Sequence, residues 1–101
     1  MAYREPIMGV YAITHAATGG RYIGSSAHIH RRFSQHRADL NHNKSRHSGL
    51  QVAWNTYGAD AFVFEVLEVV TDPTTLHEVE QRWLIASSRW LTSIIGWQSR
   101  T

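Results

Sequence analysis

Two polar residues interrupt an apolar helical stripe in the first half of the chain. Ile29, Phe33 and Leu40 recur at helical spacing, and His36 falls on the same stripe. Arg32 lies at the edge of the stripe, one turn before His36, so the two side chains are neighbours. An inward-facing polar pair is a local inconsistency of the kind found at functional sites. A hydrogen-bonded core histidine beside an arginine that extends to solvent would give the same pattern.

Glu80 interrupts a second apolar stripe, near the end of the chain. Leu76, Val79 and Trp83 form this stripe, and Glu80 falls within it. A carboxylate directed inward is costly unless it is paired with a cation or bound to a metal. We therefore predict that Glu80 is a metal ligand, with a buried ion pair to Arg32 as the alternative.

Two tyrosines occupy matching positions in a predicted hairpin, and each lies two residues from a glycine. The segments are Gly9-Val10-Tyr11 and Tyr22-Ile23-Gly24. A glycine inside a strand usually marks a bulge or a close approach, for example of a ligand. The hairpin brings the two phenols together, although two ordinary strand tyrosines would show the same spacing.

The elements that must position these residues alternate between strand and helix patterns. The sequence predicts an α+β fold, a small three-stranded antiparallel sheet flanked by three helices in the order β-β-α-α-β-α. We expect one domain over residues 1–101, with its core at about 7–90 and a tail at 91–101. The predicted strands are 7–14, 21–26 and 61–70, and the predicted helices are 26 or 27 to 42, 48–57, and 75 to 88 or 91.

The second predicted helix has a clear apolar face and a clear end. Leu50, Ala53, Trp54 and Tyr57 are predicted to point inward. Gly58 follows and is a natural helix stop.

The last predicted helix begins at a pattern typical of a capping box. Thr75 and Glu78 have the spacing S/T-x-x-E, which predicts a helix start at Thr75. The helix is expected to end at Ser88 or Leu91, and residues 94–95 are expected to add a last packed segment.

Charge is unevenly distributed along a chain whose net charge is only +2. Asp39 is the only acid between Arg21 and His47, a stretch that also holds five of the seven histidines. A basic face on a near-neutral protein indicates a polyanion partner, with DNA as the first candidate, or else a solvated helix surface. The candidate DNA-binding residues are Arg21, Arg31, Arg37, Lys44, Arg46 and His47.

Several classes of protein are excluded by composition. The absence of cysteine excludes disulfides, thiolate catalysis and cysteine-based zinc sites, and fits a reducing, cytoplasmic setting. No segment has the length of a membrane span or the pattern of a signal peptide, so no membrane is expected as a partner.

His28 and His30 point in different directions on a helix and cannot share a metal from one face, whereas metal binding by the histidine-rich loop 42–47 stays open.

The motifs described above resemble those of the GIY-YIG nucleases. Gly9-Val10-Tyr11 and Tyr22-Ile23-Gly24 resemble the paired signature of that family, with valine in place of isoleucine. Further matches follow in order through most of the chain. They are Arg32-Phe33 with His36, His47 before Ser48, Leu50-Gln51 through Trp54-Asn55 to Tyr57-Gly58, and Glu80 three residues before Trp83.

The resemblance implies hydrolysis of DNA phosphodiester bonds with one divalent ion, Mg²⁺ or Mn²⁺. Glu80 would hold the ion, which stabilises charge on the phosphate and on the leaving 3′-oxygen. Tyr11 would act as general base or orient the attacking water, with its pKa lowered by Arg32 and the ion. Tyr22 would position water or phosphate, Arg32 would clamp the phosphate, and His36 would relay a proton or orient Tyr11.

Some features depart from the family's homing-endonuclease branch or leave alternatives open. Gly96-Trp97-Gln98 stands where that branch often carries a glycine, an aromatic residue and an asparagine. Homing enzymes join this domain to a separate DNA-binding module, so we expect a monomer that works alone or with a separate or fused module. His47 would contact the DNA backbone.

Two other functions stay open at this stage. A non-catalytic DNA-binding module of the same fold would not need all five polar residues Tyr11, Tyr22, Arg32, His36 and Glu80. A nuclease specific for repair or recombination intermediates is disfavoured only modestly, by the second-helix motif.

Overall fold

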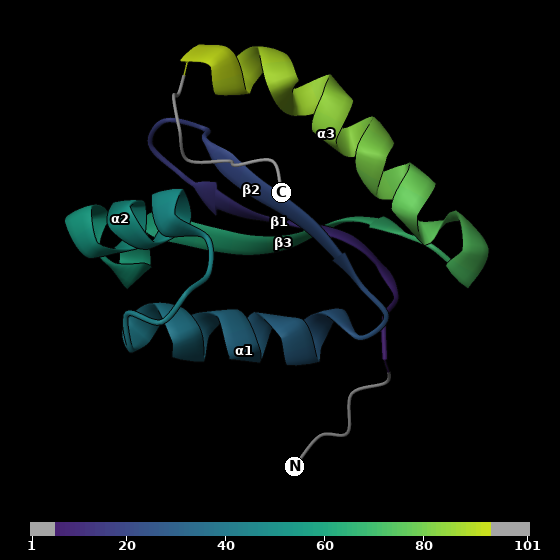
Figure 1. The fold of residues 1–101 in the computed structure, drawn as a ribbon, viewed down its shortest axis with the longest axis horizontal. Helices are drawn as coiled ribbons and strands as arrows, with labels where there is room; N and C mark the ends of the chain where they lie inside the picture. Colours follow the sequence, from purple (N-terminus) through teal and green to yellow (C-terminus); the bar gives the residue numbers. More distant parts are fainter. Residues whose placement is uncertain (1–5, 94–101) are drawn as a thin grey trace.

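The computed structural model of the protein describes residues 6–93, and the side chains of residues 6–86. Within these residues it contains a three-stranded antiparallel sheet of order β2-β1-β3 and three α-helices (Figure 1). This architecture confirms the predicted fold class and element order. The elements are β1 (Gly9–His15), β2 (Arg21–Ser26), α1 (Ile29–Asn41), α2 (Ser48–Tyr57), the 3₁₀ helix η1 (Ala59–Ala61), β3 (Phe62–Val69), the 3₁₀ helix η2 (Pro73–Thr75) and α3 (Leu76–Ser93).

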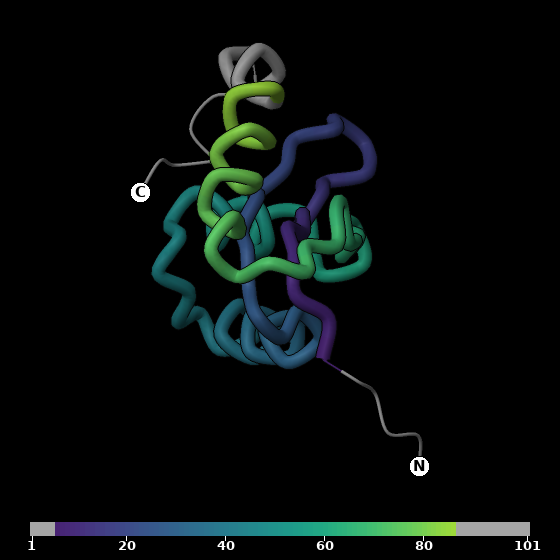
Figure 2. The backbone as a smooth tube through the Cα atoms, turned by 90° about the vertical axis from the view of Figure 1, so that its right-hand side faces the viewer, coloured from purple at the N-terminus to yellow at the C-terminus, as the bar shows by residue number. Residues whose placement is uncertain are grey.

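The sheet forms a middle layer, with α1 and α2 on one face and α3 on the other (Figures 1 and 2). The central strand β1 supplies side chains to both faces. Tyr11 and Ile13 pack toward α1 and α2, whereas Val10 and Ala12 pack toward α3. Because both faces are covered, β1 is an almost continuous apolar run without the usual polar alternation.

A bulge in the pairing of β1 with β3 explains the first motif glycine. The register shifts between Val10 and Tyr11, where Val10 pairs with Glu68 and Tyr11 with Val66. A Cβ atom on Gly9 would collide with the backbone carbonyl oxygen of Glu68. The glycine therefore allows the neighbouring strand to approach closely, as the sequence predicted in general terms.

The first helix begins later than predicted. Ser26 Oγ accepts a hydrogen bond from the backbone N–H of His28, and the N–H of Ile29 donates to the carbonyl of Ile7. These bonds hold residues 26–28 outside the helix, with His28 as its N-cap.

The predicted inward position of Tyr57 is wrong, although the other three residues of that face are buried as expected. Tyr57 is the last residue of α2 and is 57% exposed. Its ring lies against that of His15, the last residue of β1, with centroids 4.3 Å apart and the two planes tilted by 32°. Gly58 ends the helix with φ of 91°, a conformation that favours glycine.

The predicted capping box at the start of the last helix is also wrong. Asp72 Oδ1 accepts hydrogen bonds from the backbone and hydroxyl of Thr74, and η2 precedes α3. The hydroxyl and the backbone N–H of Thr75 both donate to the carbonyl of Asp72, so this N–H is not available to the Glu78 side chain as a capping box requires. α3 continues to Ser93, beyond the predicted end, and residues 94–95 lie outside the described residues. Among residues 6–93, no helix is long and apolar enough to cross a membrane.

Candidate active site

Tyr11 is buried directly opposite the second motif glycine. Its Cα pairs with that of Gly24 across the β1–β2 ladder, and only 1% of Tyr11 is exposed. A Cβ atom on Gly24 would lie 2.6 Å from the hydroxyl oxygen of Tyr11. Glycine at this position therefore leaves the space that the phenol occupies. The close approach predicted at this glycine is made by the tyrosine of the partner motif.

His36 approaches Tyr11 from α1 and is buried, as the stripe predicted. Its Nε2 lies 2.8 Å from the Tyr11 hydroxyl oxygen. Burial, and then the positive charge of Arg32, lower the pKa of His36 to about 4. The ring is therefore neutral at neutral pH and can accept or donate one proton in this hydrogen bond.

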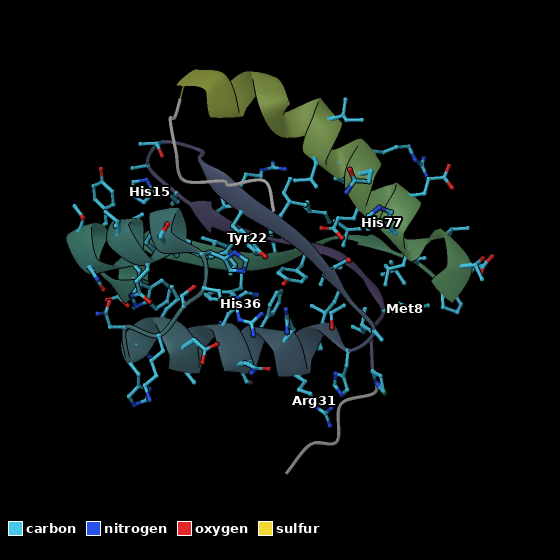
Figure 3. The ribbon with its side chains drawn as sticks, in the orientation of Figure 1. Met8, His15, Tyr22, Arg31, His36 and His77 are labelled. Carbon is cyan, nitrogen blue, oxygen red and sulfur yellow. The ribbon has the colours of Figure 1, made fainter. Side chains whose placement is uncertain are left out.

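A second tyrosine–histidine pair lies beside the first. Tyr22, on β2, forms a 3.0 Å hydrogen bond with Nε2 of His47, the residue immediately before α2. The rings of His36 and Tyr22 are 5.6 Å apart, and those of Tyr11 and Tyr22 are 6.4 Å apart. Tyr22 and His36 lie between the sheet and α1 in Figure 3. The four rings thus form one cluster, which we call the ring cluster: Tyr11, Tyr22, His36 and His47.

The hydrogen bond between His47 and Tyr22 was not expected from the sequence, which predicted only a contact between His47 and the DNA backbone. His47 precedes its helix and belongs to no apolar stripe, so periodicity cannot connect it to Tyr22. Burial lowers its pKa, with further contributions from Arg32 and Arg46. The structure therefore places His47 as a second neutral partner of a phenol.

Arg32 is largely exposed, but its guanidinium reaches the ring cluster. A hydrogen bond to Tyr11 raises the pKa of Arg32. The same contact acts to lower the pKa of Tyr11, but burial has the larger effect, and the pKa of Tyr11 is raised. The pKa of Tyr22 is raised as well, chiefly by burial. Both tyrosines are therefore protonated phenols in the free protein, and Arg32 alone does not bring the pKa of Tyr11 below its ordinary value.

Glu80 on α3 is half-buried and accepts a hydrogen bond of 2.6 Å from Ser25 Oγ on β2. Its negative charge acts to raise the pKa of both Tyr11 and Tyr22, so it lies within electrostatic range of the ring cluster. Sequence reasoning missed Ser25. Alternation along β2 was the available signal, because Ser25 shares a strand face with Ile23, which packs toward α3.

Two of the six candidate DNA-binding residues, Arg46 and His47, line a polar cleft beside the ring cluster. The other four lie elsewhere on the molecule. Arg37 places its guanidinium carbon 4.1 Å from the centroid of Phe64, and Arg31 lies on the side of α1 away from the sheet (Figure 3). Arg21 is half-buried at the start of β2, and Lys44 is exposed in the α1–α2 loop.

Comparison with known proteins assigns the chain to a family. The model of the GIY-YIG catalytic domain matches residues 7–91. A solved structure of the catalytic domain of the homing endonuclease I-TevI has a TM-score of 0.80 at 22% identity, over 93% of this chain and 99% of that chain. A mutant of the catalytic domain of the intron endonuclease I-TevI gives a TM-score of 0.77 at 23% identity, over 92% of each chain. No curated protein sequence matches significantly. Because the family model spans most of the sequence, the chain belongs to the GIY-YIG catalytic domain family.

Proposed function

We propose that the protein is a DNA endonuclease that hydrolyses phosphodiester bonds with the help of one divalent metal ion. Its catalytic residues are Tyr11, Tyr22, Arg32, His36 and Glu80. The observation that carries the proposal is the ring cluster with a guanidinium hydrogen-bonded to one phenol and a carboxylate within electrostatic range. A purely structural core has no need for this combination, because each buried polar group costs free energy that its hydrogen bonds must offset.

Arg32 is suited to hold the scissile phosphate. Its guanidinium is exposed enough to meet a substrate and permanently charged, and it contacts Tyr11. Two N–H groups directed at phosphate oxygens would stabilise the additional negative charge that develops as the phosphorus is attacked.

Tyr11 and His36 are suited to act together on the attacking water. Tyr11 is protonated, so a water proton can pass to its oxygen only if its own proton leaves. The Nε2 atom of the neutral His36, 2.8 Å away, is placed to accept it. In this assignment Tyr11 and His36 form one relay, in place of a tyrosine ionised by Arg32.

Tyr22 and His47 form the neighbouring pair. The Tyr22 hydroxyl is bonded to His47 and also carries a raised pKa, so it serves as a hydrogen-bond donor. We assign it to orienting the water or a phosphate oxygen near Tyr11.

The donor chemistry at Glu80 fits a magnesium or manganese ion. Among the residues described, no group of three or more histidine, aspartate and glutamate side chains could enclose a metal. Mg²⁺ usually retains several waters and binds one or two carboxylates together with substrate phosphate, so a single carboxylate is sufficient. When bound, the ion would stabilise negative charge on the phosphate and on the leaving 3′-oxygen.

The test of this function is cleavage of a supercoiled plasmid at low salt, with Mg²⁺, Mn²⁺ or EDTA. We expect nicked or linear DNA with either ion and none with EDTA. DNA binding in a mobility-shift assay without cleavage in either ion would instead identify a non-catalytic binding module.

A further inference from the structure

A cleft of about 190 Å³ opens between α1 and the loop that leads into α2. Neither Tyr11 nor Tyr22 is among the residues that line it, so it borders the ring cluster and does not enclose the phenols. Four lining residues share one stripe of α1, and three come from the loop. They are Arg32, Gln35, His36 and Asp39 from the helix, and Ser45, Arg46 and His47 from the loop.

The cleft is lined by hydrogen-bonding groups on every side. His36 and His47 each use Nε2 to bond a tyrosine, and the described residues give their Nδ1 atoms no partner. Across the side chains that the structure describes, no fully buried nitrogen or oxygen lacks a hydrogen-bond partner. Because the two Nδ1 atoms have no partner, they cannot be fully buried and must be accessible to solvent. Both histidine rings line the cleft.

Positive charge predominates in the cleft. Arg32 and Arg46 supply two permanent positive charges, against one negative charge on Asp39. Arg32 lowers the pKa of both histidines, and Arg46 lowers that of His47, so their potential extends over the ring surfaces. An anion placed there would meet guanidinium groups and accessible ring nitrogens together.

We propose that this cleft binds the phosphodiester group adjacent to the scissile one on the same DNA strand. The identity of the ligand rests on the proposed function, since it assumes that DNA is the substrate. Phosphates of one DNA strand follow each other at about 3.4 Å along the helix axis, so a second phosphate always lies close to the scissile one. Arg32 contacts Tyr11 of the ring cluster and also lines the cleft, so a strand whose scissile phosphate is held at Arg32 would have its next phosphate beside the cleft, where Arg46 is the second cation. Contacts of this type fix the register of the strand and thereby the position of the scissile bond.

The direct test is an NMR titration of the protein with inorganic phosphate. We expect shifts of the amide signals of residues 45–47 in the wild-type protein. Arg46→Ala should weaken phosphate binding about tenfold, as expected for loss of one charge-assisted hydrogen bond. Arg31→Ala is the matched control, because it removes the same charge from the far side of α1 and should leave binding unchanged. Equal effects of the two variants, or shifts confined to residues outside the cleft, would overturn the proposal.

Two further arms connect the site with DNA. Among the described residues that line the cleft, Asp39 is the one acid, so Asp39→Asn should tighten phosphate binding. Arg46→Ala should reduce the slope of the logarithm of DNA affinity against the logarithm of salt concentration by about 1, and Arg31→Ala should not. An unchanged slope for Arg46→Ala would refute the cleft as a DNA phosphate site. Neither titration requires cleavage, so failure of this proposal can be distinguished from failure of the proposed enzymatic function.

Discussion

At the scale of single residues, the two tripeptide motifs are explained by one steric relation. Tyr11 of the first motif pairs with Gly24 of the second, and its phenol occupies the space where a side chain would stand. The buried hydroxyl then needs a partner, which His36 supplies. The tyrosine, the glycine and the histidine are therefore one structural unit.

Gly24→Ala tests this unit. The added methyl group should displace the Tyr11 ring and its hydrogen bond, which lowers cleavage by about a hundredfold if the displacement is about 1 Å. Overpacking should also lower the free energy of unfolding by about 1–3 kcal/mol. Cleavage rates and urea unfolding measure the two effects. Gly9→Ala is the contrast, because it collides with the backbone of β3 and should mainly destabilise the fold. A Gly24→Ala protein with wild-type cleavage would contradict the steric explanation.

The low pKa of His36 predicts a pH dependence of stability. The folded protein holds this pKa at about 4, compared with 6.5 for an ordinary histidine. Between these values the unfolded chain binds a proton that the folded chain does not. The free energy of unfolding should therefore fall as pH falls from 6.5 toward 4, by up to about 3 kcal/mol from this residue.

Urea unfolding of the wild-type protein and His36→Gln between pH 4 and pH 7 measures this contribution. All other ionisable groups are present in both proteins, so the difference between the two curves reports the contribution of His36, including its interaction with His47. We expect a flatter curve for His36→Gln. Parallel curves would show that His36 titrates normally in the folded protein.

At the scale of elements, the loop between α1 and α2 is held by the buried amide of Gln51. Its Nε2 donates to the carbonyl of Leu40 at 2.9 Å and to Asn55 Oδ1 at 3.0 Å, and its Oε1 accepts from the backbone N–H of Ser45 at 3.0 Å. Ser45 Oγ in turn accepts from the N–H of His47. A continuous path of hydrogen bonds thus connects Gln51 with the histidine that bonds Tyr22.

Gln51→Met should therefore misplace His47 as well as lower stability. The change leaves the N–H of Ser45 and the carbonyl of Leu40 without this partner, at a cost of about 1–3 kcal/mol. A double-mutant cycle with His47→Ala separates positioning from stability. Measured on folded protein, Gln51→Met should reduce the cleavage rate in the wild-type background and have little further effect when His47 is absent. Additive losses would show that Gln51 does not act through His47.

At the scale of the whole molecule, the basic stretch of the sequence does not form one surface. Arg46 lines the cleft beside Arg32, whereas Arg37 covers Phe64 and Arg31 lies on the far side of α1. Linear charge counts cannot separate these positions, because consecutive helical residues point in directions about 100° apart. DNA contact is therefore expected at the side of α1 that faces the ring cluster.

Periodicity was sufficient for the fold and for part of the site. The apolar stripes predicted the order of elements, the burial of His36 and the direction of Glu80, because one side chain in a stripe must share its neighbours' environment. Periodicity could not predict the residues whose position depends on tertiary contacts. His47 lies at the boundary of a helix, and its partner Tyr22 is 25 residues away in sequence. Ser25 lies on an edge strand, and its partner Glu80 is 55 residues away. Gln98 lies outside the described residues.

The most direct test of the account compares two isosteric changes on the same helix. Glu80→Gln removes the charge proposed to hold the metal, whereas Glu78→Gln removes a charge from an exposed position two residues away. With Mg²⁺ and supercoiled plasmid, we expect Glu80→Gln to lose at least about a hundredfold in cleavage rate, since the metal contributes several kcal/mol to the transition state. Glu78→Gln should cleave at close to the wild-type rate. Wild-type cleavage by Glu80→Gln, or an equal loss in both variants, would contradict an active site built around Glu80.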